Sequence, residues 1–341
     1  EDIYSYTMRG QVNFNRIFKE KHGVAALAGA ERRLIRDRKT SVYKMGYDDH
    51  SLGYKPINPN EMNPIKGTEA ISGSYDWVDW NWNYFSHDED RYVSFYGNAS
   101  YTYNNRYSVN GSIRVDQSNL FGTDPKYQYR PLWSVGASWF MASEEFMSDV
   151  KWINRLNLRL TYGINGNVSK DTGPYMTVED YGYNSWTGDF SNKIDSPPNP
   201  ELRWEKTAVT NIGVDFSILN SRLNGTIDYY IRKSTDLLGD RDTDLTLGWP
   251  SLRVNFGSLN NKGIEVALGS VNISKPNFEW RTNLNFSYNK NKITKMKHSG
   301  TTVFSYVQGV VHTKGSPMYS LYSYKDAGLD PENGAPLVYD K

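Results

Sequence analysis

Hydrophobic and polar residues alternate along residues 93–115. Between Val93 and Tyr103, every second residue is apolar, aromatic or small, and Ser, Asn, Thr and Tyr fill most positions between them. The alternation breaks at Asn104-Asn105-Arg106 and resumes from Tyr107 to Val115. Because side chains of a β-strand point to alternate faces, the pattern predicts a hairpin with one apolar and one polar face. Each strand has about the ten residues with which a tilted strand crosses a bilayer.

The same alternation recurs along the whole chain. The other segments predicted as strands are 4–17, 22–35, 132–141, 156–164, 208–218, 223–231, 264–271 and 280–288. Short turns are expected near 19–21, 104–106, 220–222 and 274–278, and long connections at 39–91, 116–131, 165–206, 232–262 and from 290 onward. Short turns that alternate with long loops are typical of a membrane barrel, whose apolar face meets lipid. We therefore predict an all-β chain: a transmembrane antiparallel β-barrel with long extracellular loops.

Composition is compatible with this prediction but does not require it. The chain has 341 residues with 26 Tyr and 10 Trp, a mean hydropathy of −0.68, and no apolar run long enough for a membrane-spanning helix. Barrel strands are only half apolar, so low hydropathy is expected for them. A soluble carbohydrate-binding β protein would have a similar composition, and composition leaves that alternative open. The net charge of +1 gives no electrostatic case for nucleic acid.

The chain contains few of the residues and motifs that carry catalysis or bind metals. It has no cysteine, no Gly-x-Ser-x-Gly, no phosphate-binding loop and no His-Glu-x-x-His, so we expect neither an enzyme nor a cofactor. Asp48-Asp49-His50 and His87-Asp88-Glu89-Asp90 offer ligand atoms. Adjacent residues of an extended chain point in opposite directions, so we expect no metal site at either.

Aromatic residues are densest in the predicted loop 75–85. Their exposed rings would stack on sugars or anchor a partner protein. The alternative is a self-packed hairpin stabilised by cross-strand aromatic pairs. Trp186 and Trp249 are weaker candidates for the same role. The candidate substrate- or partner-binding residues are thus Trp77, Trp80, Trp82, Tyr84, Trp186 and Trp249.

Two further groups of polar residues concern the surroundings of a barrel. The residues predicted to face the lumen are Asn157, Arg159, Asp215, Asp228 and Arg281. Their simplest role is hydration and packing against a plug. The run 31–39 is locally basic and would suit lipopolysaccharide phosphates at the outer rim. For that run we favour the alternative, a solvated strand end with internal Arg–Asp pairs.

Several blocks, in this order and spacing, resemble the SusC/RagA family of TonB-dependent outer-membrane transporters. The strongest block reads Asn-Pro-Glu-Leu-Arg-Trp-Glu-Lys-Thr at 199–207 and continues through 211–216 and 221–238. The other blocks are 133–139, 145–147, 158–163, 261–265, 289–293 and 327–334.

The resemblance implies a plugged barrel of the 22-stranded type. Residues 1–341 would be a single partial domain of a longer protein, holding middle-to-late strands, with the plug and the terminal strands outside this chain. The family imports large nutrients, usually oligosaccharides and sometimes peptides, through the outer membrane of bacteria. Its partners would be TonB, a SusD-like surface lipoprotein and outer-membrane lipid or lipopolysaccharide. Two rival functions stay open at this point: a soluble extracellular glycan-binding β protein and a passive porin.

Overall fold

The computed structural model describes residues 1–42, 47–54, 84–121, 123–170, 172–184, 186–249, 251–296, 303–307 and 311–339. These residues form two compact units, Glu1–Arg9 with Glu31–Tyr92, and Gly10–Ala30 with Val93–Lys341. No helix in the described ranges combines the length and the apolar character needed to cross a membrane.

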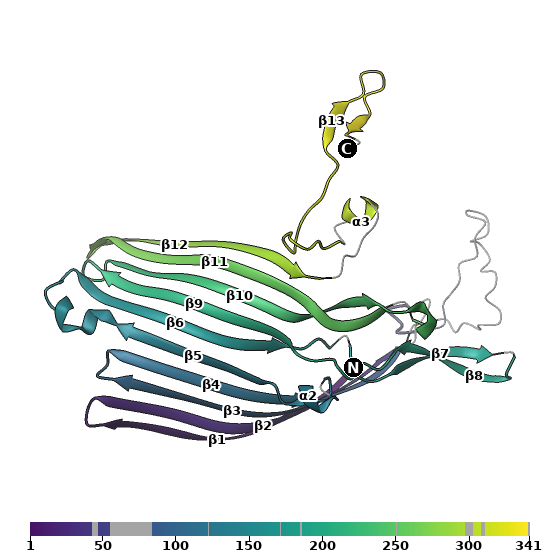
Figure 1. The fold of residues 1–341 in the computed structure, drawn as a ribbon, viewed down its shortest axis with the longest axis horizontal. Coiled ribbons are helices and arrows are strands. Elements are labelled where there is room, and N and C mark those ends of the chain that lie inside the picture. Colours follow the sequence, from purple (N-terminus) through teal and green to yellow (C-terminus); the bar gives the residue numbers. More distant parts are fainter. Residues whose placement is uncertain are drawn as a thin grey trace. The chain divides into compact units, whose positions relative to one another are not determined.

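Ten strands form one sheet, in the order β1-β2-β3-β4-β5-β6-β9-β10-β11-β12 (Figure 1). All pairs from β4 to β12 are antiparallel. The strands are β1 Asp2–Phe18, β2 His22–Ser41, β3 Tyr84–Tyr103, β4 Tyr107–Ser118, β5 Pro131–Phe140, β6 Ile153–Asn167, β9 Glu205–Ile218, β10 Leu223–Asp242, β11 Ser251–Lys275 and β12 Phe278–Lys295. The all-β prediction is confirmed, and every segment predicted as a strand lies almost entirely within one.

Smaller elements occupy the connections. Two separate hairpins pair β7 (Thr177–Asn184) with β8 (Asp189–Ser196) and β13 (Asp326–Leu329) with β14 (Pro336–Val338). The helical segments are α2 Pro125–Gln128, η3 Met141–Ser143, η4 Glu145–Met147, η5 Leu245–Leu247 and α3 Val303–Val307.

The main departure from expectation is the connection predicted at 232–262. Strands β10 and β11 continue to pair across most of it, up to Asp242 opposite Ser251, with a bulge between Ser234 and Leu237. Beyond the bulge both faces of β10 carry charged residues (Asp240, Arg241 and Asp242), whereas β11 still alternates, with Leu252, Val254 and Phe256 on one face. The alternation on β11 was thus present in the sequence but was not assigned to a strand, and its partner segment on β10 has no regular apolar alternation to mark it.

The short turns lie together at one end of the larger unit, at the left of Figure 1. Asn104 and Asn105 both have left-handed backbones, with φ of 51° and 54°, as a tight two-residue hairpin turn requires. Their turn is tied to the next one through Glu144, which accepts hydrogen bonds from the hydroxyl of Tyr107, from Trp139 (3.0 Å) and from Arg106 (3.1 Å). These bonds, the one from Tyr107 first, hold the pKa of Glu144 below its usual range.

Strand register places the apolar residues of neighbouring strands on one face. Ile212 lies opposite Leu160 and Tyr229, and Ile264 lies opposite Tyr229 and Tyr288. This face is not covered by protein: Ile212 is 54% exposed and Tyr288 is 56% exposed. Within the described residues no large side chain is fully buried. A soluble β protein would bury this face, so the soluble alternative is not supported.

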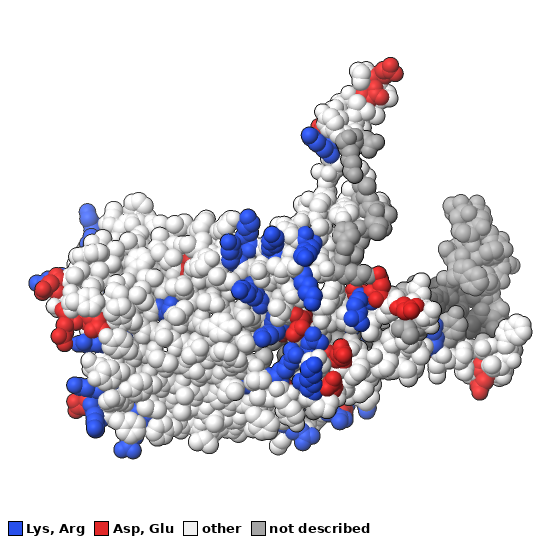
Figure 2. All heavy atoms as spheres, in the orientation of Figure 1, with Lys and Arg blue, Asp and Glu red and all other residues white. Residues whose placement is uncertain are grey.

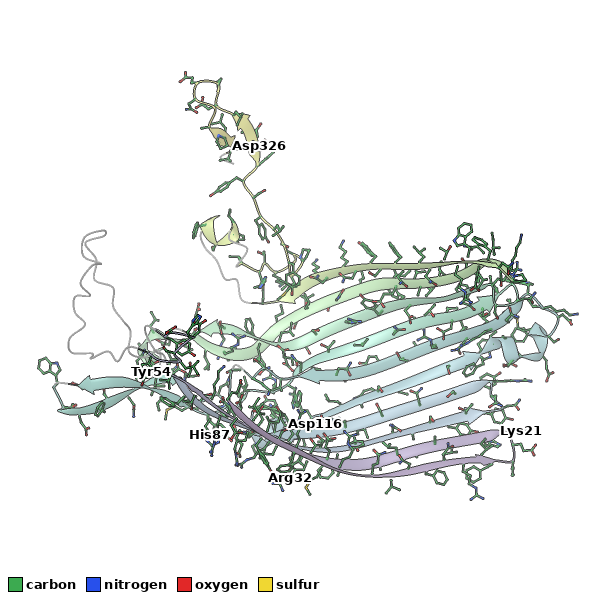
Figure 3. All side chains as sticks on the ribbon, turned by 180° about the vertical axis from the view of Figure 1, so that it is seen from behind. Lys21, Arg32, Tyr54, His87, Asp116 and Asp326 are labelled. Carbon is green, nitrogen blue, oxygen red and sulfur yellow. The ribbon has the colours of Figure 1, made fainter. Side chains whose placement is uncertain are left out.

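The opposite face is polar, and Figure 3 shows the side chains that both faces carry along the strands. Asp116, labelled there, belongs to a polar group on β3 and β4. Arg114 donates to Asp116 (2.7 Å) and to the hydroxyl of Ser94 (2.8 Å), and its guanidinium lies 5.7 Å from the ring centre of Tyr96. Charged groups therefore pair with one another on this face.

Candidate functional site

A network of charged side chains joins three strands on the polar face. Arg159 of β6 donates to Asp215 of β9 through both Nε (2.9 Å) and Nη2 (3.0 Å), and Nη2 also donates to Asp228 of β10 (3.1 Å). Asn157 and Thr226 donate to the two oxygens of Asp215 at 3.1 and 3.2 Å. One guanidinium thus links two carboxylates from neighbouring strands.

Gly213 explains why Arg159 can reach both carboxylates. Arg159 and Asp228 are both register partners of Gly213, on either side of it. A Cβ at this position would lie 2.5 Å from Oδ1 of Asp228 and 2.6 Å from Nη2 of Arg159. Only a residue without a side chain leaves the guanidinium room to cross β9 above the backbone. The glycine is therefore part of the network.

The network is polar and only partly covered. The side chains of Arg159, Asp215 and Asp228 keep between a sixth and a third of their area exposed. Beside Asp228 lies a hollow of about 290 Å³, partly lined by Thr226, Glu265 and Ser287. A wet face fits this arrangement, because paired charges in contact with water avoid most of the cost of desolvation.

Four of the five residues predicted to face the lumen meet in this network, and the fifth does not. Arg281 lies on the same face but near the turn between β11 and β12, where it pairs with Glu279 at 2.7 Å. The pattern of alternation placed all five on one face. It had no means of showing which of them touch, because contact depends on the register between strands.

The predicted aromatic residues are only partly within the described residues. Trp77, Trp80 and Trp82 lie outside them, and Tyr84 begins β3 with only its backbone described. Trp186 lies in the turn between β7 and β8 and is 96% exposed. Trp249 is half-buried, and its carbonyl accepts a hydrogen bond from Thr243. Of the six, Trp186 is thus the described ring most open to a ligand.

A second polar cluster lies beyond the apolar band, towards the long connections, and sequence reasoning missed it. Asp236, at the bulge of β10, pairs with Arg203 (2.8 Å) and Arg130 (3.2 Å), and both guanidinium groups lie 4.9 Å from the ring centre of Tyr127. The buried amide of Asn255 donates to the carbonyls of Arg203 and Asp236, both at 2.8 Å. Burial opposes ionisation of Asp236, but the two ion pairs outweigh it and hold its pKa below the usual range.

The signal for this cluster was present in the block at 199–207. Leu202 is buried, and Asn199 donates to the carbonyl of Arg253 at 2.7 Å, so the block is anchored to β11. Phe121 packs edge-on against Trp204 with ring centres 4.5 Å apart. The block therefore joins the long connections to the sheet, which its resemblance alone did not reveal.

Two expectations about charged segments need correction. The argument against ligand geometry at Asp48-Asp49-His50 assumed an extended chain, but these residues begin a turn and their ligand atoms come within 4.8 Å of one another. All three are exposed, and Ser51 donates to Asp48 at 2.6 Å, so one carboxylate of the cluster is already engaged within the turn. In the basic run 31–39, the carboxylate that pairs with Arg36 is Glu89 of β3 (2.7 Å), rather than an aspartate within the run.

Comparison with known proteins places these observations in a family. A family sequence model described as "TonB dependent receptor-like, beta-barrel" matches residues 4–331. TonB-dependent receptor P39 of Formosa agariphila is 29% identical over 333 residues, which cover 96% of this chain and 29% of that protein. TonB-dependent receptor SusC of Bacteroides thetaiotaomicron is 31% identical over 264 residues, covering 72% of this chain and 26% of that protein. The chain spans less than a third of the length of these relatives.

Solved structures show the same fold. The RagAB peptide importer in its "open-open" state matches with a TM-score of 0.80 and 24% identity, covering 99% of this chain and 35% of that chain. The RagAB peptide transporter matches with a TM-score of 0.78 and 23% identity, again covering 99% and 35%. At this identity the likeness is one of fold.

Proposed function

This chain belongs to the family of TonB-dependent receptor-like β-barrels of the bacterial outer membrane, and we propose that the protein containing it imports large nutrients across that membrane. Residues 1–341 then form a single partial domain with middle-to-late strands of the barrel. The observation that carries the proposal is the pairing of an uncovered apolar face with a charged, wet face on the same strands. Lipid on one side and water on the other is the environment that this arrangement suits.

The polar face then lines the lumen. In this proposal the network around Arg159 holds strands β6, β9 and β10 in register where neither lipid nor a protein core packs against them. Its groups hydrogen-bond water, a plug or a passing polar substrate. Transport proceeds by rearrangement of a plug rather than by covalent chemistry, so none of these residues has a catalytic role.

Oligosaccharides are the first candidate substrate. The support is the exposed aromatic ring of Trp186, because aromatic faces stack on sugar rings. The other aromatic candidates, Trp77, Trp80, Trp82, Tyr84 and Trp249, belong to the same proposal. Peptides are the second candidate, because the structural neighbour RagAB is named a peptide importer. The proposed partners are TonB, which supplies energy through a region outside this chain, and a SusD-like lipoprotein at the extracellular side.

Uptake by living cells tests the proposal. A strain that carries the full-length protein is compared with a deletion strain and a TonB-deficient strain, with fluorescently labelled oligosaccharides and peptides as cargo. We expect one cargo class to enter only when both the protein and TonB are present. Equal uptake in all three strains would contradict the proposal that this protein is an importer. Uptake that needs the protein but not TonB would favour a passive porin.

A Trp186→Ala variant tests the aromatic candidates. We expect it to lower oligosaccharide uptake about two- to tenfold, since stacking on one aromatic ring contributes about 0.5 to 1.5 kcal/mol. The matched control is Trp152→Ala, because Trp152 is also exposed but lies among the short turns at the other end of the strands. A Trp186→Ala variant with wild-type uptake would remove Trp186 from the proposed site. An effect of both substitutions would point to stability instead.

A further inference from the structure

Lysines border the apolar band on four consecutive strands. Going along the apolar face from the apolar band towards the long connections, the first residue beyond the band is a lysine on each of β9, β10, β11 and β12. The last residues of the band before these lysines are Ala208, Ile231, Ile264 and Tyr288. Lys292 extends the group by one more position on β12. The lysine belt consists of Lys206, Lys233, Lys262, Lys290 and Lys292.

Figure 2 shows these strands from the side on which blue side chains gather at the border of a broad uncharged band. All five lysines of the belt are exposed. Strand register brings them together: Lys262 lies directly opposite Lys290, and Lys292 lies opposite Asn260, which in turn lies opposite Lys233. The belt therefore crosses neighbouring strands of the sheet.

A structural role within the chain does not explain the belt. Like charges directly opposite one another on a sheet destabilise it, as Lys262 and Lys290 do here. In the part of the chain that the structure describes, none of the five lysines forms an ion pair with a carboxylate. On β4 and β6 the corresponding positions beyond the band are Gln117 and Gly166. Within the strands from β4 to β12, the lysines at this border therefore all belong to β9 to β12.

A cleft continues the belt at Lys206. It has a volume of about 430 Å³, and its lining includes Lys206, Trp133 and Trp204. Two carboxylates also line it, but both are engaged. Glu205 accepts from the backbone N–H of Leu238 at 3.0 Å, and Asp236 pairs with two arginines. The cleft therefore offers an ammonium group beside aromatic rings at the edge of the apolar band.

We propose that the lysine belt, with this cleft, binds a phosphorylated glycolipid of the outer leaflet. The belt lies at the end of the strands that leads to the long loops, which is the extracellular side in barrels of this kind. Lysines just outside a lipid band attract anionic headgroups. The phosphates meet the ammonium groups while the acyl chains cover the apolar residues next to them, such as Tyr229 and Ile264. A soluble phosphate would satisfy only the first of these contacts.

The bound lipid would remove the repulsion within the belt and cover the apolar face that protein leaves open. The proposal rests on the outer-membrane location and is independent of which nutrient is carried. A transporter with no oligosaccharide cargo would still bind the lipid, so the two proposals fail separately.

Lipid titration of the full-length protein in mild detergent tests the belt. The probe is diphosphoryl lipid A, and the same lipid without its phosphates is the comparison; binding is followed by native mass spectrometry. We expect K206Q/K233Q/K262Q/K290Q to bind diphosphoryl lipid A at least tenfold more weakly than the wild type. The wild type should show a loss of similar size when the phosphates are removed.

A second quadruple variant controls for total charge. K19Q/K21Q/K151Q/K275Q removes four exposed lysines from the short-turn end and is expected to bind within twofold of the wild type. Heat-modifiable electrophoretic migration checks that each variant forms its barrel. If the belt quadruple variant fails this check, K262Q/K290Q is tested, with an expected loss of at least threefold. Equal binding by the belt and control variants, or no preference for the phosphorylated lipid, would overturn the proposal.

Discussion

The two faces of strands β6, β9 and β10 have the same backbone but opposite surroundings. On one face Leu160, Ile212 and Tyr229 lie side by side and remain uncovered by protein. On the other face, Arg159 and Asp228 meet above Gly213. Adjacent residues therefore depend on different partners, lipid on one face and charged side chains on the other. A substitution that is harmless on one face should be costly on the other.

The largest effect is expected when a charge is placed on the apolar face. Phe286→Arg puts a guanidinium into the band of β12, opposite Val266, and should cost about 2 to 4 kcal/mol if it lies near the bilayer midplane. The measurement is urea unfolding of the full-length protein in lipid.

Ser287→Arg is the matched control for that substitution. Ser287 is the next residue, it is exposed on the polar face, and it lies opposite Glu265. We expect a change within about 0.5 kcal/mol. Equal destabilisation by the two variants would contradict the assignment of the faces.

Removal of the guanidinium of Arg159 should have the next largest effect on the free energy of unfolding. Arg159→Gln leaves Asp215 and Asp228 without their shared cation, and we expect a loss of about 1.5 to 3 kcal/mol, the range for hydrogen bonds to charged groups. Arg281→Gln is the control, because Arg281 is on the same face but forms only an exposed pair with Glu279. That pair should contribute less than about 1 kcal/mol. If both variants lose the same stability, the network contributes no more to stability than an exposed ion pair does.

A smaller effect is expected at the glycine beneath the network. Gly213→Ala introduces a Cβ that would lie 2.5 Å from Asp228 and must displace the ends of flexible side chains. We expect a loss of about 1 kcal/mol, the lower end for overpacking. Gly111→Ala serves as control, since its Cβ would meet nothing closer than 3.6 Å. Chemical unfolding of both variants measures the difference, and a neutral Gly213→Ala would show that the network adjusts freely.

The smallest effect concerns pH and the cluster around Asp236. The pKa of Asp236 lies below its unfolded value because its ion pairs outweigh the effect of burial. Its contribution is therefore complete above the unfolded pKa of about 3.9 and disappears as the pH falls through the lower folded pKa. In unfolding measured between pH 2 and 7, the wild type should lose more stability than Asp236→Asn below about pH 4. Parallel curves would show that the ion pairs of Asp236 do not stabilise the fold.

Much of the fold was predictable because a single-layer sheet between lipid and water requires apolar and polar residues to alternate along each strand. The alternation at 208–218 and 223–231 marked β9 and β10, and the turn near 220–222 was confirmed between them. The prediction failed at 232–262, which was expected to be a long connection. Beyond the bulge between Ser234 and Leu237, the segment of β10 up to Asp242 has charged residues on both faces, and the short alternation of Leu252, Val254 and Phe256 on β11 was included in a predicted loop.

For the candidate sites, the sequence predicted which residues share a face of the sheet but not which of them are in contact. Alternation placed Asn157, Arg159, Asp215, Asp228 and Arg281 together on the polar side. The side chains that touch were decided by register, since Arg159 and Asp228 both lie opposite Gly213 while Arg281 lies near a turn. The cluster of Arg130, Arg203 and Asp236 joins residues as many as 106 positions apart, which no local pattern encodes.

By itself the sequence determined that this protein has strands with one apolar and one polar face, joined by short turns and long connections; the ladders continue well beyond the predicted ten residues, to 25 in β11. Those features depend on neighbours along the chain, because a strand's side chains alternate whatever lies beside it. The tertiary structure alone decided that lysines from four strands form one belt and that one guanidinium links two carboxylates across a glycine. Such contacts exist only after the strands have paired in one register, and a shift of a single residue would turn every one of them to the other face.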